Sequence, residues 1–117
     1  VLLGKTISNI KKEDNERLYF FCTDGSEYLM YHSQDCCESV GIEDIEGSLD
    51  DLLGSPILQA EEVSHGGRFN GKPESQYSES FTWTFYKLAT IKGYVTIRWL
   101  GESNGYYSES VDFEQVV

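Results

Sequence analysis

The sequence predicts a mainly β protein: an antiparallel β-sandwich, barrel or strongly curved sheet with one or two short helices. Three observations support this fold class. About seven segments alternate polar with apolar residues, or are rich in β-branched and aromatic residues, as strands are. Turn signals such as Asp24–Gly25 and Asn104–Gly105 separate neighbouring segments. A single stretch, Ser48–Leu53, begins with a capping residue and has helical character.

The first two-thirds of the chain is expected to contain short strands, one helix and one long loop. A hairpin signal joins the strands Arg17–Cys22 and Glu27–His32. Ser48 is expected to cap a helix of about two turns that stops at Gly54. The glycine-rich stretch His65–Glu79 has no periodic apolar pattern and is predicted to be a loop. Further strands are expected within Lys5–Lys12, at Val40–Ile45 and in an extended segment from Pro56 to Val63.

The last third is predicted to be a meander of three antiparallel strands, Ser80–Ile91, Tyr94–Glu102 and Tyr106–Val117. The expected turns are Lys92–Gly93 and Asn104–Gly105, since Asn-Gly suits a two-residue hairpin turn with positive φ at both central positions. Side chains along each strand alternate between two faces. The expected core face collects Phe81, Trp83, Phe85, Val95, Ile97, Trp99, Tyr107, Val111 and Phe113.

The opposite face of the meander combines hydroxyl groups and phenol rings with a single arginine, Arg98. A guanidinium group binds phosphate through two parallel hydrogen bonds and stacks on flat rings, so this composition favours a nucleotide ligand. Three alternatives stay open: a solvated sheet face, a contact between oligomer subunits, and an Arg98 that only pairs with a carboxylate such as Glu102 or Asp112. The face is assigned Thr82, Thr84, Tyr86, Tyr94, Thr96, Arg98, Tyr106, Ser108 and Ser110, with bases stacked on Tyr86, Tyr94, Tyr106 or Trp83.

Length and charge narrow the class of protein further. The 117 residues correspond to one domain, residues 1–117, and no apolar run approaches the length of a membrane-spanning helix. The net charge is -11, and the segment from Leu18 to Gly67 contains no Lys or Arg. Binding to nucleic-acid polymers or anionic membranes needs basic residues, so both are disfavoured. The acidity suits either a solvated surface or a surface that imitates nucleic acid.

The segment His32–Glu38 concentrates polar and thiol groups. Its adjacent cysteines, Cys36 and Cys37, are poorly placed around one tetrahedral ion, which disfavours zinc. A Cys–His nucleophile pair has the right residue types but no supporting oxyanion signature. With Cys22 the chain has three cysteines, which do not form a disulfide framework and suit a reducing cytoplasm. The polar residues of this segment either cap an irregular stretch or line a ligand-binding loop; the candidate ligand residues are His32, Gln34 and Asp35.

Three segments, Tyr31–Val40, Thr82–Thr90 and Val95–Ser110, carry a resemblance that covers nearly the whole chain. In them the sequence resembles a family of small bacteriophage-encoded proteins of formerly unknown function. That family is similar to viral anti-CBASS-type sponge proteins, which sequester the cyclic nucleotides of bacterial anti-phage signalling and assemble as oligomers. The resemblance implies a phage immune-evasion protein in the host bacterial cytoplasm. Its implied partners are a cyclic oligonucleotide or related nucleotide signal and further copies of itself.

The leading hypothesis is therefore a binding protein that sequesters a cyclic nucleotide second messenger without cleaving it. The alternative is an acidic nucleic-acid mimic that inhibits a host defence protein, which the long stretch without basic residues favours. A small hydrolase using His32 with Cys36 or Cys37 ranks last, because the general base would lack an identifiable orienting partner. No catalytic residue, metal ligand or cofactor is predicted.

Overall fold

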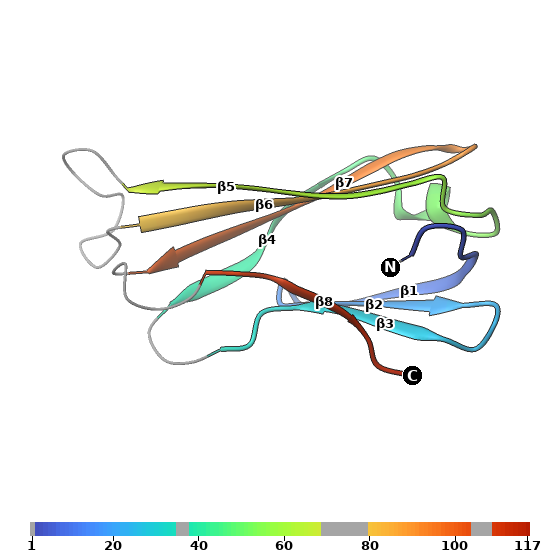
Figure 1. Cartoon of the computed structure of the whole chain (residues 1–117), viewed down its shortest axis with the longest axis horizontal. Helices are drawn as coiled ribbons and strands as arrows, with labels where there is room; N and C mark the ends of the chain where they lie inside the picture. The colour runs from blue at the N-terminus through green and yellow to red at the C-terminus, as the bar shows by residue number, and fades with distance from the viewer. Residues whose placement is uncertain (1, 35–37, 69–79, 104–108) are drawn as a thin grey trace.

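The computed structural model describes residues 2–34, 38–68, 80–103 and 109–117. These residues form two four-stranded antiparallel sheets stacked face to face (Figure 1), which confirms the β-sandwich among the predicted alternatives. The first sheet has the strand order β1-β2-β3-β8 and the second has the order β4-β7-β6-β5. The strands are β1 (Ile7–Glu13), β2 (Arg17–Cys22), β3 (Glu27–Tyr31), β4 (Ser39–Glu46), β5 (Gln59–Arg68), β6 (Ser80–Thr90), β7 (Gly93–Ser103) and β8 (Asp112–Gln115).

The turn between β2 and β3 forms where the Asp-Gly signal predicts it. Gly25 has a φ of 89°, a conformation that glycine adopts without steric cost. The Asp24 carboxylate accepts a hydrogen bond from the Ser26 backbone N–H at 2.9 Å and pairs with the Lys5 ammonium group. Lys5, followed by Ser26, holds the pKa of Asp24 well below its usual value. These contacts tie the start of the chain to the first hairpin.

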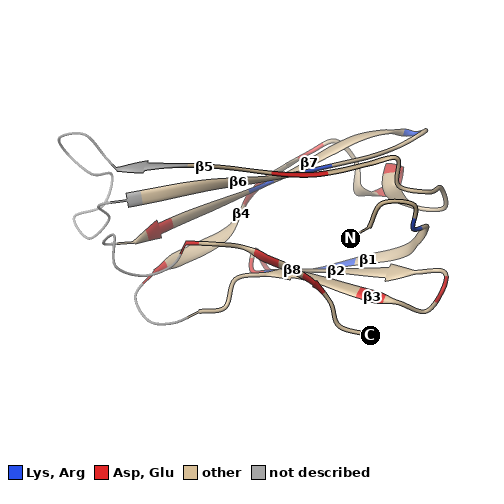
Figure 2. Cartoon of the chain, viewed as in Figure 1, with Lys and Arg blue, Asp and Glu red and all other residues tan. Residues whose placement is uncertain are grey.

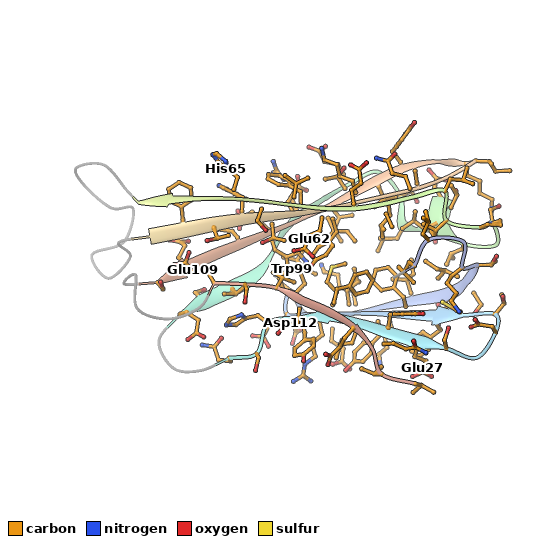
Figure 3. The ribbon with its side chains drawn as sticks, viewed as in Figure 1. Glu27, Glu62, His65, Trp99, Glu109 and Asp112 are labelled. Atoms are coloured by element: carbon orange, nitrogen blue, oxygen red, sulfur yellow. The ribbon has the colours of Figure 1, made fainter. Side chains whose placement is uncertain are left out.

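The hydrophobic core lies between the two sheets. Trp99 lies fully buried there (Figure 3). Its indole Nε1 donates to the Met30 sulfur at 3.1 Å. Each large side chain removed from water in this way stabilises the fold by roughly 1.5–3 kcal/mol. The buried hydrophobic residues of this cluster are Leu2, Ile7, Leu18, Phe20, Cys22, Tyr28, Met30, Val40, Ile42, Leu52, Ile57, Tyr86, Leu88, Val95, Ile97, Trp99 and Val111.

The predicted faces are right for β7 and wrong for β6. Val95, Ile97 and Trp99 point into the core as expected. On β6, however, Thr84, Tyr86 and Leu88 point inward, whereas Phe81, Trp83 and Phe85 are half-buried on the outer side. The β6–β7 register explains the difference, because Thr84 lies opposite Trp99 and Tyr86 opposite Ile97. Residues directly opposite each other in a sheet share a face.

The third strand of the predicted meander does not stay beside β7. Instead β8 crosses to the first sheet and pairs with β3, with Met30 opposite Phe113. Val111 is buried and Phe113 packs against the core, so both keep their predicted core role from the other sheet. The expected turn at Asn104–Gly105, together with Tyr106, Tyr107 and Ser108, lies outside the described residues.

Two further boundaries differ from the prediction. The expected helix is a short 3₁₀ helix, Leu49–Leu52, and the Ser48 side chain makes no capping hydrogen bond. The predicted loop starts later than expected, because His65 to Arg68 continue β5 in register with β6. Residues 69–79 of that loop lie outside the described part of the chain. No helix among the described residues is long and apolar enough to cross a membrane.

Candidate functional site

The outer face of the second sheet carries the candidate site. Cross-strand pairing aligns four residues in one row, with Val63 on β5 opposite Phe85 on β6, Phe85 opposite Arg98 on β7, and Arg98 opposite Asp44 on β4. The next row places His65 opposite Trp83, and Figure 3 shows His65 pointing away from the first sheet. This face therefore brings aromatic rings and a guanidinium group together on the solvent side of the sandwich.

Arg98 makes two described contacts on this face. Its guanidinium carbon lies 5.6 Å from the centre of the Trp83 ring, within the range of a cation–π interaction. Its Nη2 donates to Asp44 Oδ2 at 3.0 Å. The Arg98 Nε is buried and has no hydrogen-bond partner among the described residues. Arg98 therefore pairs with a carboxylate, as one of the alternatives from the sequence predicts. The carboxylate belongs to Asp44 and not to Glu102 or Asp112.

Beside Arg98 the surface is hollowed into a groove of about 430 Å³, which we call the Arg98 groove. The Trp83 and Phe85 rings are stacked next to it, 6.3 Å apart with an angle of 21° between their planes. Small-molecule pockets commonly have volumes of about 300–1,000 Å³, so the groove has room for a nucleotide-sized group. It is lined by Glu46, Val63, Phe85, Lys87, Thr96 and Arg98.

Figure 2 shows that acidic residues are spread over both sheets, whereas basic residues are few. Within the Arg98 groove, Lys87 and Arg98 supply positive charge, and Glu46 supplies negative charge at the β4 side. Lys87 lies opposite Thr96, and Thr96 lies opposite Glu46, so the charges form a second row across the sheet. The groove therefore contains two of the few basic residues of a strongly acidic chain, each with a carboxylate nearby: Asp44 pairs with Arg98, and Glu61 lies opposite Lys87.

The structure brings four of the predicted site residues to the outer face. Arg98 and Thr96 line the Arg98 groove, Trp83 stacks beside it, and Tyr94 is exposed near the β6–β7 turn. The prediction is wrong for Thr84 and Tyr86, which are buried between the sheets. Three further predicted residues, Asp35, Tyr106 and Ser108, lie outside the described part of the chain.

Tyr86 is a core residue with a satisfied hydroxyl group. Its hydroxyl donates to the Val111 backbone oxygen at 3.2 Å, which links the second sheet to the segment before β8. Burial raises the pKa of Tyr86 well above its usual value, and the carboxylates of Glu62 and Asp112 raise it further. A ring held in this way cannot stack on a ligand at the outer face.

His32 and Gln34 belong to a different group of residues, at the junction between β3 and β4. The His32 Nδ1 donates to the Ser110 backbone oxygen at 2.6 Å, and a proton is shared between its Nε2 and Glu38 Oε2 at 2.8 Å. Gln34 Nε2 donates to the Glu38 backbone oxygen at 2.8 Å. The His32 and Glu38 side chains are almost fully buried. We call these residues the His32 cluster; they tie the connection between β3 and β4 to the connection between β7 and β8.

A second carboxylate, Glu109, is held close by. It accepts hydrogen bonds from Thr82 Oγ1 at 2.7 Å and from the Ser103 hydroxyl. Figure 3 shows Glu109 at the end of the sandwich where β7 ends. Gly101 is required beside it, because a Cβ there would lie 2.7 Å from the Glu109 Cβ. These contacts give Thr82 and Gly101 a structural role.

Sequence reasoning missed most of the groove. Phe85 was assigned to the core, and Val63 and Lys87 were given no role, although all three line the groove with Arg98. The outward position of Phe85 follows from the length of the β6–β7 turn, because that length fixes which residues of the two strands lie opposite each other. No local signal reveals Asp44 or Glu46, because they reach Arg98 and Thr96 through the pairing of β4 with β7, strands that are far apart in sequence.

Among the described residues, no group of three or more His, Cys, Asp and Glu side chains is arranged to hold a metal ion. Cys22 is free and buried. Cys36 and Cys37 lie outside the described residues.

Comparison with known proteins gives one family match. A family model described as "Domain of unknown function (DUF7448)" matches residues 1–113. No curated protein and no solved structure gives a significant match to the chain.

Proposed function

The chain belongs to the DUF7448 family, whose function is unknown, and we propose that it binds a cyclic nucleotide signal in the Arg98 groove and sequesters it without cleavage. The observation that carries the proposal is the position of the Arg98 guanidinium beside two stacked aromatic rings, in a groove that also contains Lys87. Nucleobases stack on aromatic rings, and guanidinium groups bind phosphate through two hydrogen bonds. The resemblance of the sequence to a phage-encoded family that is itself similar to sponge proteins supports the same proposal.

Arg98 must exchange its present partner to bind a phosphate. The Arg98–Asp44 pair is partly exposed, with 34% and 44% of the two side chains accessible to water, and such pairs contribute about 0.2–1 kcal/mol. A hydrogen bond to a charged group contributes about 1.5–3 kcal/mol. A phosphate that binds through two oxygens would also accept a hydrogen bond from a second N–H of the guanidinium group. Loss of the Asp44 contact therefore costs little, and it leaves Asp44 free to return to water.

Binding without cleavage is supported by the state of His32. Both ring nitrogens are occupied, one by the Ser110 oxygen and the other by Glu38. A general base needs a free nitrogen within reach of the proton that it removes. Sequestration in the bacterial cytoplasm requires tight binding alone, and an immune-evasion role for a phage protein is part of the proposal.

Substitution of Arg98 tests the site. Arg98→Ala is expected to weaken cyclic-nucleotide affinity about ten- to a hundredfold, the equivalent of a lost charge-assisted contact of about 1.5–3 kcal/mol. Arg98→Lys is expected to weaken it too, because an ammonium group lacks the planar fork. Titration calorimetry on the folded variants measures both effects.

Arg17→Ala is the matched control, since Arg17 is exposed on the first sheet and lines a separate polar hollow with His32 and Gln34. It is expected to bind like the parent. If Arg17→Ala lost affinity and both Arg98 variants kept it, the site would lie at that hollow and the present assignment would be wrong.

A further inference from the structure

Strand β5 forms an unusually open edge of the second sheet. It is ten residues long and pairs with β6 over its whole length without a register shift. Five consecutive residues, Glu61 to His65, are exposed. Figure 1 shows β5 along the border of the sheet. An open edge presents unpaired backbone N–H and C=O groups that another strand can bind.

The other three edges are each protected, among the strands that the structure describes. β1 has an irregularity between Ile7 and Asn9 and carries Lys11 and Lys12. β4 is irregular between Ile42 and Asp44, and the Ile42 N–H is already bound to the Asn15 oxygen at 2.6 Å. β8 has only four residues. Bulges, edge lysines and short strands are the usual devices against edge pairing. β5 is long and contains no lysine, proline or bulge, and its charged residues are Glu61, Glu62 and Arg68.

We infer that β5 pairs with β5 of a second copy of the chain, antiparallel and across a two-fold axis, so that the two second sheets become one continuous sheet. The inference rests on the strand edge and does not require nucleotide binding. A second copy of the chain is the expected partner of this edge. In an antiparallel pair of β5 strands the side chains of one copy complement those of the other, and most homodimers have two-fold symmetry.

Sheet geometry restricts where the axis can pass. Opposite residues must share a face, and under a two-fold axis perpendicular to the sheet this requires a residue to lie opposite its own copy. Centring the axis on Val63 places Glu61 opposite His65 of the other copy, and Glu62 opposite Ser64 of the other copy. Each carboxylate then meets a side chain that can donate a hydrogen bond.

Neighbouring centres are less favourable. An axis at Glu62 sets two carboxylates directly opposite each other, which is destabilising. An axis at Ser64 sets Glu61 and Glu62 opposite glycines of the other copy and leaves both without a side-chain partner. The centre at Val63 also covers an aliphatic side chain that is 42% exposed in the single chain.

This dimer would leave the outer face of the second sheet accessible, and it would contain two copies of the Arg98 groove. The row of Asp44, Arg98, Phe85 and Val63 continues through Val63 of the second copy into the same row in reverse order. Two Arg98 grooves then lie on one face of the continuous sheet, each with its own Val63 at the two-fold axis. Nucleotide binding and dimerisation are therefore compatible, and either can be tested without the other.

Mass measurement without any ligand tests the interface. Light scattering or sedimentation equilibrium at micromolar concentration is expected to give twice the 13.3 kDa of the single chain. Val63→Lys sets two ammonium groups opposite each other and is expected to weaken dimerisation on the order of a hundredfold. Ile91→Lys is the matched control, because Ile91 is 80% exposed in the β6–β7 turn and should leave the dimer intact.

An exchange of charges tests the register. His65→Glu alone sets like charges opposite each other at two places and is expected to weaken the dimer on the order of tenfold. Adding Glu61→His to that variant recreates both pairs with their members exchanged and should restore the parent affinity. If Val63→Lys fails to fold, the His65→Glu variant and the double variant still test the dimer. A monomeric parent, a Val63→Lys or His65→Glu protein with the parent's mass, or a double variant without recovery would overturn the inference.

Discussion

Replacing Trp99 with alanine is expected to lower the free energy of unfolding by about 3–5 kcal/mol, the usual loss for a large aromatic residue deleted from a core. The Trp99 side chain is fully buried between the sheets, and its indole nitrogen donates to the Met30 sulfur. Neither the hydrogen bond nor the packing can be recovered by a methyl group. Urea unfolding followed by circular dichroism measures the change.

Trp83→Ala is the matched control, since it removes the same side chain from the neighbouring strand. Trp83 is half-buried on the outer face, where it contacts the Phe85 ring and the Arg98 guanidinium group. Its loss is expected to cost about 1 kcal/mol of stability. Equal losses for the two tryptophans would contradict the assignment of the two faces.

Glu38→Ala is expected to cost at least about 1–3 kcal/mol, because it leaves the buried Nε2 of His32 without its hydrogen-bond partner. The Glu38 carboxylate is fully buried and lies 2.8 Å from His32 Nε2, and it also accepts a hydrogen bond from Gln34. Loss of the carboxylate should loosen the junction between β3 and β4. Unfolding measurements near neutral pH give the value.

A double variant separates the polar contact from packing. Replacing His32 and Glu38 together with apolar residues of similar size removes both polar partners at once, and such replacements of buried pairs are often neutral. The double variant should therefore be more stable than Glu38→Ala. A loss below about 0.5 kcal/mol for Glu38→Ala is typical of surface positions. Such a result would show that the contact between His32 and Glu38 does not stabilise the fold.

The strands themselves were predictable, because apolar alternation and turn residues are local signals. The faces of β6 were also within reach. Thr90 pairs with Gly93 across the two-residue turn Ile91–Lys92, so even-numbered residues of β6 always lie opposite odd-numbered residues of β7. Placing Ile97 and Trp99 in the core thus forces Tyr86 and Thr84 inward. The aromatic residues Trp83 and Phe85 misled the prediction because large rings are usual in cores.

The course of β8 could not be predicted in the same way. The alternation of Val111 and Phe113 shows which side of the strand faces the core, but it does not show whether the strand pairs with β7 or with β3. The choice depends on how the two sheets stack. The partner of Arg98 is set by the same kind of long-range contact, in which Asp44 reaches it from β4.

The His32 cluster shows why polar sequence motifs are ambiguous. His32 and Gln34 have the composition of a ligand-binding loop, yet they bind Glu38 and the Ser110 backbone. The composition fixes which hydrogen bonds are available, and only the fold determines whether they are made to the protein itself or to a ligand.

Recovery of a bound nucleotide tests the central claim most directly. The folded protein would be incubated with a panel of cyclic nucleotides, freed of unbound ligand, and denatured, and the released compound would be identified by mass spectrometry. Our account expects one of these nucleotides to be retained and released intact. Release of a cleaved product would identify an enzyme, and retention of none would contradict nucleotide sequestration and favour an acidic mimic of nucleic acid.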